Sequence, residues 1–299
     1  MKILITGGSG FIGSHLVEHY QGRAEIVVLD NFRSGHRRNL AGLECELVEG
    51  SVQDRRVVER VMTGVDSVFH LAALVSVPES MTAVRETVDL NVHGLLNVLE
   101  AARTAGVRKL CFASSAAVYG ENPEQPKRET LTPDPRSPYA VTKLDGEYYC
   151  DLYAREGWLA TSALRFFNVF GPRQDPASAY AAAVPIFVQK ARAGEPITIF
   201  GDGGQTRDFI YVKDIVGALA FLAERPDLRG VFNAGYGGTI TIRELADMIV
   251  TLTGSTSEIV HQPTRPGDIR YSQADVSRLL ATGWQPQFTL EEGLRQMLG

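Results

Sequence analysis

Cysteines are few in this sequence, and none lies close to another. The 299 residues include three of them, Cys45, Cys111 and Cys150. A disulfide-rich scaffold or a cysteine-based zinc site needs more cysteines at shorter spacing, and no cluster of His, Cys and Asp has the spacing of metal ligands. We therefore expect buried, reduced thiols, as in a cytoplasmic protein, and no bound metal.

Long hydrophobic runs and an excess of positive charge are absent as well. No apolar run approaches the about 18 residues of a transmembrane helix, and the first apolar segment starts at residue 2, which leaves no room for a signal peptide. With 30 Lys and Arg against 35 Asp and Glu, the net charge is −5. We therefore expect no membrane and no nucleic acid as partners, and an anionic substrate would need local arginines.

The first half of the sequence alternates between apolar and helical segments. Apolar runs occur at 2–5, 26–29, 45–48, 67–71, 109–113 and 161–166. Helical patterns lie between them at 12–20, 54–63, 91–105 and 139–156. Nearly continuous hydrophobicity is typical of parallel strands that are buried on both faces. The alternation predicts an α/β fold, a Rossmann-type doubly wound parallel sheet formed by residues 1–167.

The pattern changes after Phe167, where prolines divide the chain into shorter elements with more loop. This change predicts a smaller, mixed α/β substrate domain formed mainly by residues 168–299. Within it, residues 209–212 and 230–233 look like strands. We expect these segments, near 209–233, to return to the main sheet.

Three glycines after the first apolar run fit a dinucleotide-binding pattern. Gly7, Gly10 and Gly13 have the spacing G-x-x-G-x-x-G. The first glycine permits a tight turn, the second lets the backbone approach a pyrophosphate, and the third lets the helix pack on the strand. The helix that begins near Phe11 offers unpaired N–H groups and its positive dipole end to phosphates.

An acid at the end of the second apolar run completes this pattern. Asp30 lies 23 residues after Gly7, and its carboxylate can accept hydrogen bonds from both adenosine ribose hydroxyls while repelling a 2′-phosphate. NAD is therefore expected in preference to NADP. Two alternatives stay open: Asp30 is a turn residue beside Asn31, or the nearby Arg33 accommodates NADP.

The residues that suggest catalysis lie in the middle of the chain. Ser115 follows the apolar run 109–113, while Tyr139 and Lys143 are four residues apart on an expected helix and project from one face. A phenol ionises at about pH 10, and an adjacent ammonium and an oxidised nicotinamide would pull this pKa toward neutrality. Such a tyrosine can remove a hydroxyl proton while hydride leaves the same carbon, and Ser115 can hold that hydroxyl. The alternative is an exposed Tyr/Lys pair.

These motifs together resemble the extended short-chain dehydrogenase/reductase family. The likeness rests on Thr6–Gly13, Ser114–Gly120 and Tyr139–Lys143, and it covers nearly the whole chain. The sequence looks most like the nucleotide-sugar (UDP-sugar) 4-epimerases. The resemblance implies an NAD-dependent isomerase that interconverts UDP-glucose and UDP-galactose through a transient 4-keto sugar, and a homodimer formed through the two long helices.

The resemblance also implies a role for each site residue. Tyr139 matches the catalytic base, Ser115 its partner on the substrate hydroxyl, and Lys143 the group that lowers the tyrosine pKa and binds the nicotinamide ribose. The implied cofactor-binding residues are Gly7, Gly10, Phe11, Ile12, Gly13, Asp30, Asn31, Leu71, Ala72, Ala73, Asn91, Tyr139 and Lys143. Ser51 is a departure, because it stands where the family often has an aspartate near the adenine.

Two alanines distinguish this sequence from relatives with other chemistry. Relatives that dehydrate or decarboxylate nucleotide sugars carry acidic residues just after the catalytic Ser or Thr, because elimination of water needs a group that protonates the departing hydroxyl. Here Ala116 and Ala117 occupy those positions. This disfavours dehydratase and decarboxylase activity, and leaves chemistry that needs a hydride and one proton.

The second half of the chain resembles the family's substrate site. Asn168 matches an asparagine that contacts the sugar nucleotide, and Arg207 and Arg265 match arginines that bind the diphosphate. Surface positions, or a simple pairing of Arg207 with Asp208, are the alternatives. Ser272 matches a position where a small residue leaves room for an N-acetyl group, so UDP-GlcNAc and UDP-GalNAc are expected as further substrates.

Two other functions stay open at this point. A nucleotide-sugar dehydrogenase or reductase of the same fold would consume free NAD(P)H during turnover, and a non-catalytic NAD-sensing protein would have lost Tyr139 or Lys143. Both of these residues are present. His70 lies in an apolar run and is expected to be a satisfied core histidine.

Overall fold

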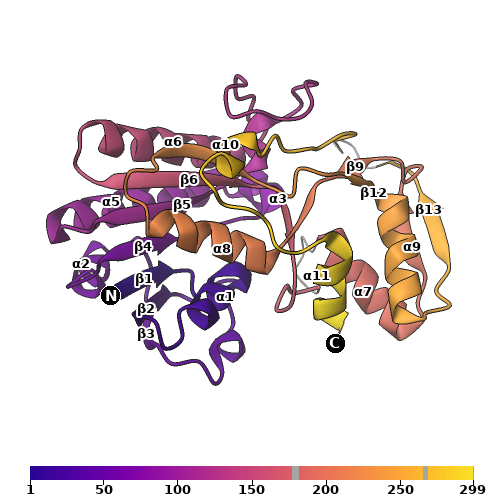
Figure 1. The fold of residues 1–299 in the computed structure, drawn as a ribbon, viewed down its shortest axis with the longest axis horizontal. Coiled ribbons are helices and arrows are strands. Elements are labelled where there is room, and N and C mark those ends of the chain that lie inside the picture. The colour runs from indigo at the N-terminus through magenta and orange to yellow at the C-terminus, as the bar shows by residue number, and fades with distance from the viewer. Residues whose placement is uncertain (177–181, 265–268, 299) are drawn as a thin grey trace. The chain divides into compact units, whose positions relative to one another are not determined.

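The computed structural model describes residues 1–176, 182–264 and 269–298, which form two compact units (Figure 1). The first unit consists of Met1–Gly120, Thr132–Phe166 and Ile215–Phe232. The second unit consists of the described residues within Glu121–Leu131, Phe167–Asp214 and Asn233–Gly299. Segments from both halves of the sequence therefore enter each unit.

A seven-stranded sheet forms the centre of the first unit. Its strands are β1 (Lys2–Thr6), β2 (Glu25–Asp30), β3 (Glu46–Glu49), β4 (Ser67–His70), β5 (Lys109–Ser115), β6 (Ala160–Phe166) and β11 (Gly230–Ala234). Their order is β11-β6-β5-β4-β1-β2-β3, and β1 to β6 pair in parallel. The order reverses at β1, as in dinucleotide-binding folds. The doubly wound sheet predicted from the sequence is confirmed.

The helices of this unit follow the strands closely. They are α1 (Phe11–His19), α2 (Arg55–Val61), α3 (Val77–Thr82), α4 (Val84–Val88), α5 (Gly94–Ala105), α6 (Pro138–Arg155) and most of α8 (Val212–Ala223), with short 3₁₀ helices η1 (Arg37–Leu40) and η3 (Ala116–Tyr119). The helix expected to begin at residue 91 starts earlier. A π-helical segment, η2 (Asp89–His93), joins α4 to α5, and such segments often mark functional sites.

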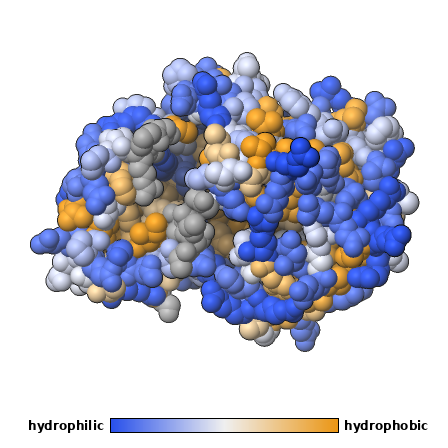
Figure 2. Space-filling model, turned by 180° about the vertical axis from the view of Figure 1, so that it is seen from behind, coloured by the Kyte–Doolittle hydropathy of each residue, from blue (hydrophilic) through white to orange (hydrophobic). Residues whose placement is uncertain are grey.

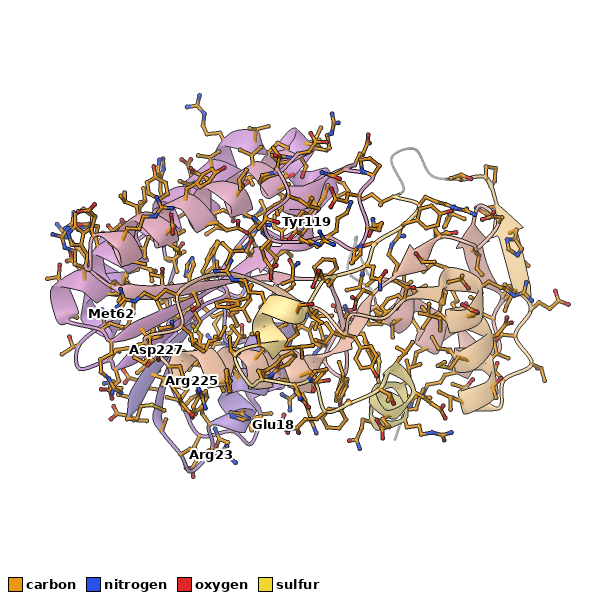
Figure 3. The ribbon with its side chains drawn as sticks, turned by 45° about the horizontal axis from the view of Figure 1, so that its top comes forward. Glu18, Arg23, Met62, Tyr119, Arg225 and Asp227 are labelled. Carbon is orange, nitrogen blue, oxygen red and sulfur yellow. The ribbon has the colours of Figure 1, made fainter. Side chains whose placement is uncertain are left out.

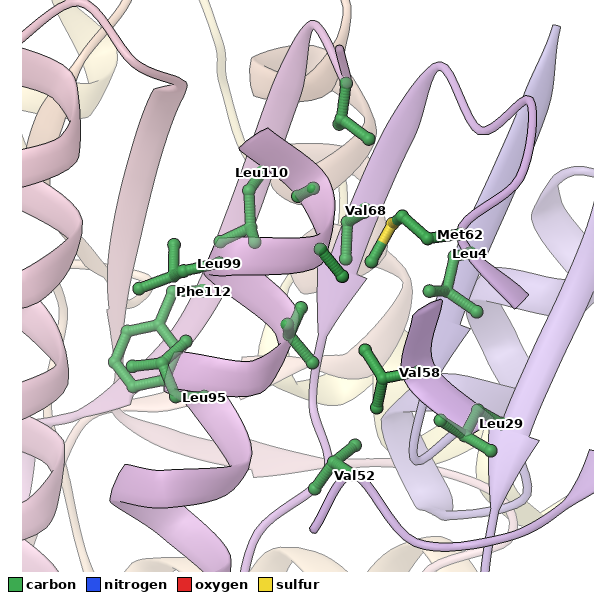
Figure 4. Packing of buried hydrophobic residues seen from close by; sticks show 14 of the residues in the cluster. Leu4, Leu29, Val52, Val58, Met62, Val68, Leu95, Leu99, Leu110 and Phe112 are labelled. Carbon is green, nitrogen blue, oxygen red and sulfur yellow. The ribbon is translucent and has the colours of Figure 1, made fainter. Parts of the chain in front are cut away.

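The core of the first unit explains why β5 has no polar side chain along most of its length. Leu110 and Phe112 point to one face of the sheet and pack with Leu95 and Leu99 of α5 (Figure 4). Cys111 points to the other face, where its thiol donates to the carbonyl of Leu219 in α8 at 3.7 Å. Both faces are therefore covered by helices, which is the physical reason for the continuous hydrophobic run.

The second unit is built from shorter pieces. Three strand pairs occur in its described residues: β7 (Asn168–Phe170) with β10 (Phe209–Tyr211), β8 (Ile197–Phe200) with β13 (Ile259–Gln262), and β9 (Thr206–Arg207) with β12 (Ile240–Thr241). Its helices include α7 (Ala183–Ala193), α9 (Ile242–Thr253), α10 (Ser277–Leu280) and α11 (Leu290–Leu298). The expected mixed α/β character of this region is confirmed.

The two segments that looked like returning strands behave differently. Gly230–Ala234 is the edge strand β11 of the main sheet, beside β6. Phe209–Tyr211 instead pairs with Asn168–Phe170 in a separate sheet. The rings of Phe170 and Tyr211 lie 5.6 Å apart and form part of the core of the second unit. This packing explains the separate position of β10.

The three cysteines are free, and Cys111 and Cys150 are buried as expected. Cys45 differs, because it precedes the short strand β3 and is only half-buried. Among the described residues, no helix is both long enough and apolar enough to cross a membrane.

Candidate functional site

The glycine-rich turn after β1 leaves no space for side chains. Gly7 has a φ of +74°, in the left-handed region, and an added Cβ would lie 2.9 Å from the backbone nitrogen of Ala72. A Cβ at Gly13 would lie 2.3 Å from the carbonyl oxygen of Gly7. The backbone nitrogen of Leu71 donates to Thr6 at 3.1 Å. Leu71 and Ala72 therefore lie directly against the turn, next to the glycines with which they were predicted to act.

The start of α1 is open to an anion. Its N-cap residue is Gly10, which has no side chain to accept hydrogen bonds from the first turn, and the first turn contains no acidic residue. The N–H groups of Phe11 and Ile12 belong to this uncapped turn, where the helix dipole favours negative charge. The narrow glycine turn and the open helix end suit a pyrophosphate.

Asp30 lies at the end of β2 beside the same turn. Its side chain is 7% exposed, and its two carboxylate oxygens accept from the backbone nitrogens of Ser9 at 2.9 Å and Phe32 at 2.8 Å. Each oxygen keeps a lone pair for a further donor such as a ribose hydroxyl. Asp30 therefore also fixes the glycine-rich turn, a role that the sequence did not predict. Asn31 follows Asp30, and its side chain accepts from the backbone nitrogen of Arg33 at 3.1 Å.

Arg33, the residue considered as a possible site for NADP, is already paired within the protein. Its guanidinium forms ion pairs with Glu79, at 2.7 Å, and with Glu86. These two carboxylates raise the pKa of Arg33 further, so it stays charged. A 2′-phosphate would have to compete with both of them, which favours NAD.

Asn91 connects two segments near the predicted cofactor site. Its amide oxygen accepts from the nitrogen of Leu74 at 2.7 Å, and its amide nitrogen donates to Leu74 at 3.1 Å and to the hydroxyl of Thr142 at 3.0 Å. Both amide hydrogens are thus used within the protein. Asn91 holds the segment after β4, which includes Ala73, to helix α6.

Ser115, Tyr139 and Lys143 are brought together at the end of β5. The side chain of Ser115 accepts from the nitrogen of Ala117 at 3.1 Å and lies near enough to Tyr139 to influence the pKa of its hydroxyl. The Lys143 ammonium lies 5.7 Å from the centre of the Tyr139 ring and donates to the carbonyl of Ala113 at 2.8 Å. The three side chains therefore form one group, as their spacing in the sequence predicts.

The pKa of Tyr139 differs from the sequence-based expectation. Burial raises this pKa above its usual value, and the hydrogen bond from Ser115 opposes the rise only in part. Burial also lowers the pKa of Lys143 to about 8. In the protein alone, the predicted lowering of the tyrosine pKa by Lys143 is therefore not found, because desolvation disfavours the phenolate and Ser115 is the group that opposes it. An additional positive charge at the site would be needed to reverse it.

His70 is buried between β1 and β5. Its Nδ1 lies 2.8 Å from the hydroxyl of Thr6, and its ring stacks on Phe112 at 6.0 Å. Burial, with a contribution from Lys143, lowers its pKa to about 3, so it is neutral. His70 is a satisfied core histidine, as predicted. Within the described part of the chain, no three acidic, His or Cys side chains gather as a metal site.

The second unit holds three of the residues predicted to bind substrate, Asn168, Arg207 and Ser272, whereas Ser115 belongs to the first unit. Asn168 donates its side-chain N–H to the carbonyl of Asp208 at 2.8 Å, and Arg207 precedes that residue and donates to Thr206. Thr206 bridges to Tyr271, next to the half-buried Ser272. The structure therefore brings Asn168, Arg207 and Ser272 into one region. Arg265 lies outside the described residues.

Asp208 is a residue of this region that sequence reasoning missed. Its buried carboxylate accepts from the nitrogens of Tyr236 at 2.8 Å, Gly237 at 3.0 Å and Ala274 at 3.0 Å. Burial raises its pKa to about 6 against the effect of these three donors. Asp208 therefore organises the backbone around Arg207 instead of serving only as a partner for that arginine. In the sequence, the one indication that Asp208 belongs to this region was its position next to Arg207.

The sequence is similar to known proteins over most of its length. The model of the NAD dependent epimerase/dehydratase family matches residues 3–235. A UDP-glucose 4-epimerase of Mycolicibacterium smegmatis is 38% identical over 307 residues, which cover 98% of this chain and 96% of that protein.

Solved structures are similar over equally long stretches. A UDP-N-acetylglucosamine 4-epimerase of Methanobrevibacter ruminantium, in complex with UDP-N-acetylmuramic acid, has a TM-score of 0.96 and 39% identity, covering 99% of this chain and 96% of that one. A UDP-glucose 4-epimerase of Thermus thermophilus, in complex with NAD, has a TM-score of 0.90 and 38% identity, covering 100% and 98%. The similarity therefore includes both units.

Proposed function

Since this chain belongs to the NAD dependent epimerase/dehydratase family, we propose that Tyr139, Ser115 and Lys143 carry out the reaction of a UDP-sugar 4-epimerase. The chain is an NAD-dependent isomerase that interconverts UDP-glucose and UDP-galactose through a transient 4-keto sugar. The observation that supports the assignment of residues is the position of the buried Tyr139 ring, 5.7 Å from the Lys143 ammonium and close enough to Ser115 for that side chain to influence its pKa.

NAD is the cofactor, and the first unit has residues suited to each of its parts. The glycine-rich turn and the first turn of α1 would hold the pyrophosphate, and Asp30 would hold the adenosine ribose. Lys143 would bind the nicotinamide ribose. Bound NAD would supply an acceptor for the hydride of the sugar C4 and would return the same hydride later, so the sugar undergoes no net oxidation.

The protein's own contribution is to hold and move one proton. Ser115 orients the sugar 4-hydroxyl through its Oγ, and the Tyr139 oxygen takes the proton as the carbonyl forms at C4. The Lys143 ammonium stabilises the phenolate against the burial that disfavours it. After the 4-keto sugar rotates in the pocket, Tyr139 would return the proton to the C4 carbonyl oxygen as the hydride is returned to the opposite face of C4, which gives the epimeric alcohol. Ala116 and Ala117 supply no second acid, so water is not eliminated.

The nucleotide sugar is assigned to residues of the second unit. Asn168, Arg207 and Arg265 would bind the sugar nucleotide and its diphosphate, and this gives the two units the roles of an NAD-binding and a substrate domain. We propose that the small, half-buried Ser272 leaves room for an N-acetyl group. UDP-GlcNAc and UDP-GalNAc are then substrates alongside UDP-Glc and UDP-Gal.

The test is to supply UDP-Glc, UDP-GlcNAc and UDP-GlcA separately to protein purified without added cofactor, and to separate the products by chromatography. Formation of the C4 epimer without net change in NADH absorbance is expected. Steady consumption of added NAD(H) without epimer would instead identify a dehydrogenase or reductase. Absence of any product together with tight NAD binding would identify a non-catalytic protein.

A homodimer is proposed from an apolar surface on α6. Val141, Tyr148 and Leu152 are 50%, 61% and 44% exposed, and their spacing places them on one side of this helix, whose other side is buried. On the face that Figure 2 shows, hydrophobic residues lie in patches among hydrophilic ones. A second copy of the same helix is the expected occupant, because a closed dimer pairs one patch with itself.

Light scattering after size-exclusion chromatography tests this assembly. The wild type should have the mass of two chains, and Tyr148→Glu with Leu152→Glu should have the mass of one. A wild-type mass of about one chain of 32.7 kDa would contradict the dimer. We also propose the cytoplasm as its location, which suits the free thiols of Cys111 and Cys150.

A further inference from the structure

A buried ion pair lies one helical turn beyond Lys143 on α6. The carboxylate of Glu147 accepts from Nε of Arg165 at 2.8 Å and from Nη2 at 2.7 Å. The side chains of Arg165 and Glu147 are 4% and 3% exposed. Burial of an ion pair is costly, and apolar residues of similar size would often be as stable. Stability alone therefore does not account for the pair. The reaction proposed above assigns no role to either residue.

Glu147 connects α6 to the ends of two neighbouring strands. Its carboxylate also accepts from the hydroxyl of Ser114 in β5, and Ser114 and Arg165 are direct register partners in β5 and β6. The Arg165 guanidinium also lies 4.7 Å from the centre of the Tyr119 ring in η3, a residue labelled in Figure 3. One carboxylate thus holds the helix against the strand ends from which Ser115 and η3 continue.

Lys143 makes the adjacent connection. Tyr139, Lys143 and Glu147 follow each other at intervals of four residues, so they lie on one face of α6. Lys143 donates to the carbonyl of Ala113, and Glu147 binds the next residue, Ser114. Consecutive residues of β5 are therefore bound by consecutive turns of α6. A shift of the helix would move Tyr139 away from Ser115.

The groups around Lys143 differ in charge. His70, on β4, is neutral at neutral pH because its pKa is about 3, and burial raises the pKa of the Cys150 thiol on α6. Tyr139 is neutral while its pKa remains raised. Burial lowers the pKa of Lys143 to about 8, and Cys150 and then Glu147 oppose this lowering. Because the raised pKa of Cys150 keeps it a neutral thiol at neutral pH, Glu147 is the neighbour whose carboxylate lies on the same face of α6 as Lys143.

We propose that Glu147 is a positioning residue for the epimerase reaction. Through Ser114 and Arg165 it fixes α6 against β5, and its charge keeps Lys143 an ammonium next to Tyr139. This inference rests on the proposed function, since it assigns Glu147 a role in preparing the same three residues. The buried ion pair with Arg165 then serves to hold α6 against β5 and β6.

Two variants and one control separate this role from a purely structural one. Glu147→Gln removes the charge, whereas Glu147→Asp keeps the charge and shortens the side chain. Asp151→Asn removes a carboxylate on the same helix whose partner, Arg155, is exposed. The readouts are the NMR titration of ¹⁵N-labelled lysine, with the Lys143 signal identified through Lys143→Arg, and kcat as a function of pH.

In Glu147→Gln, the titration midpoint of Lys143 and the alkaline limit of kcat should both move down by about one pH unit. In Glu147→Asp the midpoint should stay near the wild-type value while kcat falls, because the helix is no longer held at the same distance. Asp151→Asn should match the wild type in both measurements. A merely structural role would lower kcat equally at every pH and leave the midpoint unchanged.

The inference is overturned if Lys143 titrates at the wild-type pH in Glu147→Gln. If that variant does not fold, Glu147→Gln with Arg165→Met removes both buried charges and takes its place. Its Lys143 midpoint should then move less than in Glu147→Gln alone, because a positive charge is lost with the negative one, while kcat should fall because Glu147 no longer holds α6 to β5; an unchanged kcat in this double variant would overturn the inference. The lysine titration needs no turnover. A wild type without epimerase activity would therefore refute the proposed function, while the titration would still decide the inference.

Discussion

The two units hold their site residues in different ways. Ser115, Tyr139 and Lys143 belong to the first unit, where β5 has seven residues and α6 has eighteen. Asn168 and Arg207 belong to the second unit, on strands of three and two residues. In the first unit, side chains of α6 bind the backbone and side chains of β5. In the second, the single carboxylate of Asp208 binds two backbone segments, at Tyr236–Gly237 and at Ala274.

From this difference we propose that each unit determines a different property of the reaction. A long helix bound to a central strand holds catalytic atoms within the narrow limits that proton transfer requires. Short strand pairs joined through one side chain can change their loops without disturbing the sheet. Substitutions in the first unit should therefore change the rate of the chemical step, and substitutions in the second should change which sugar is accepted.

The largest effect is expected for Tyr139→Phe in the first unit. Removal of the hydroxyl should lower kcat by about 10²–10⁴-fold, because a positioned general base contributes that much. NAD should stay bound, as measured from the absorbance of cofactor released on denaturation. Tyr149→Phe, on the same helix, is the matched control and should keep full activity. An active Tyr139→Phe variant would refute the proposed base.

The units should also respond to pH in opposite directions. The pKa of His70 is lowered to about 3, so the unfolded chain binds more protons below about pH 6.5, and this residue makes the protein less stable as pH falls. The pKa of Asp208 is raised to about 6, so the folded chain binds more protons between about pH 4 and 6, and its contribution to stability decreases as pH rises.

Urea unfolding at several pH values measures both effects. His70→Asn should remove a loss of stability on acidification. Asp208→Asn should remove an opposite trend of roughly 3 kcal/mol across pH 4 to 6. Parallel stability curves for the wild type and either variant would show that the residue does not titrate differently on folding.

A smaller effect is expected for Gly7→Ala, which tests the cofactor turn. The new Cβ would meet the backbone of Ala72 at 2.9 Å, and the dissociation constant of NAD should rise by about 10-fold or more, since backbone strain of this kind costs about 1–3 kcal/mol. Calorimetric titration with NAD measures it. Gly64→Ala is the control, because Gly64 has a similar φ of +72° but open space around it. Equal affinities in the two variants would mean that the contact with Ala72 is unimportant.

The smallest effect is expected for Ser272→Tyr in the second unit. A bulky side chain should lower kcat/KM for UDP-GlcNAc by about 10-fold relative to UDP-Glc, as pocket volume alone discriminates only modestly. The ratio of the two values in parallel assays is the measurement. An unchanged ratio would remove Ser272 from the sugar pocket and leave the epimerase assignment intact.

The sheet and the grouping of Tyr139 with Lys143 could be predicted because both depend on local patterns. Residues 110–113 form a continuous apolar run because β5 is covered on both faces. Tyr139 and Lys143 share a helix face because residues four positions apart on a helix lie on the same side. The spacing of Gly7, Gly10 and Gly13 predicted the turn at Gly7, because this pattern also lies within a short stretch of sequence. These features do not require knowledge of distant contacts.

The rest depends on contacts between distant residues. Glu147 meets Arg165 only because Ser114 and Arg165 share a register, and Asp208 meets Ala274 across 66 positions of sequence. The rise in the pKa of Tyr139 also escaped prediction, because burial is a property of the folded chain. Each of these requires the tertiary structure.

Gly146 shows how a missing atom can control the depth of the catalytic helix. A Cβ there would lie 2.5 Å from the ring of Phe112 and 3.0 Å from Leu95, so even alanine would push α6 outward. Because Gly146 has no side chain, α6 can lie close enough to β5 for the Lys143 ammonium to donate to the carbonyl of Ala113. An engineer who wished to retune this enzyme could adjust that one spacing and leave every reactive group in place.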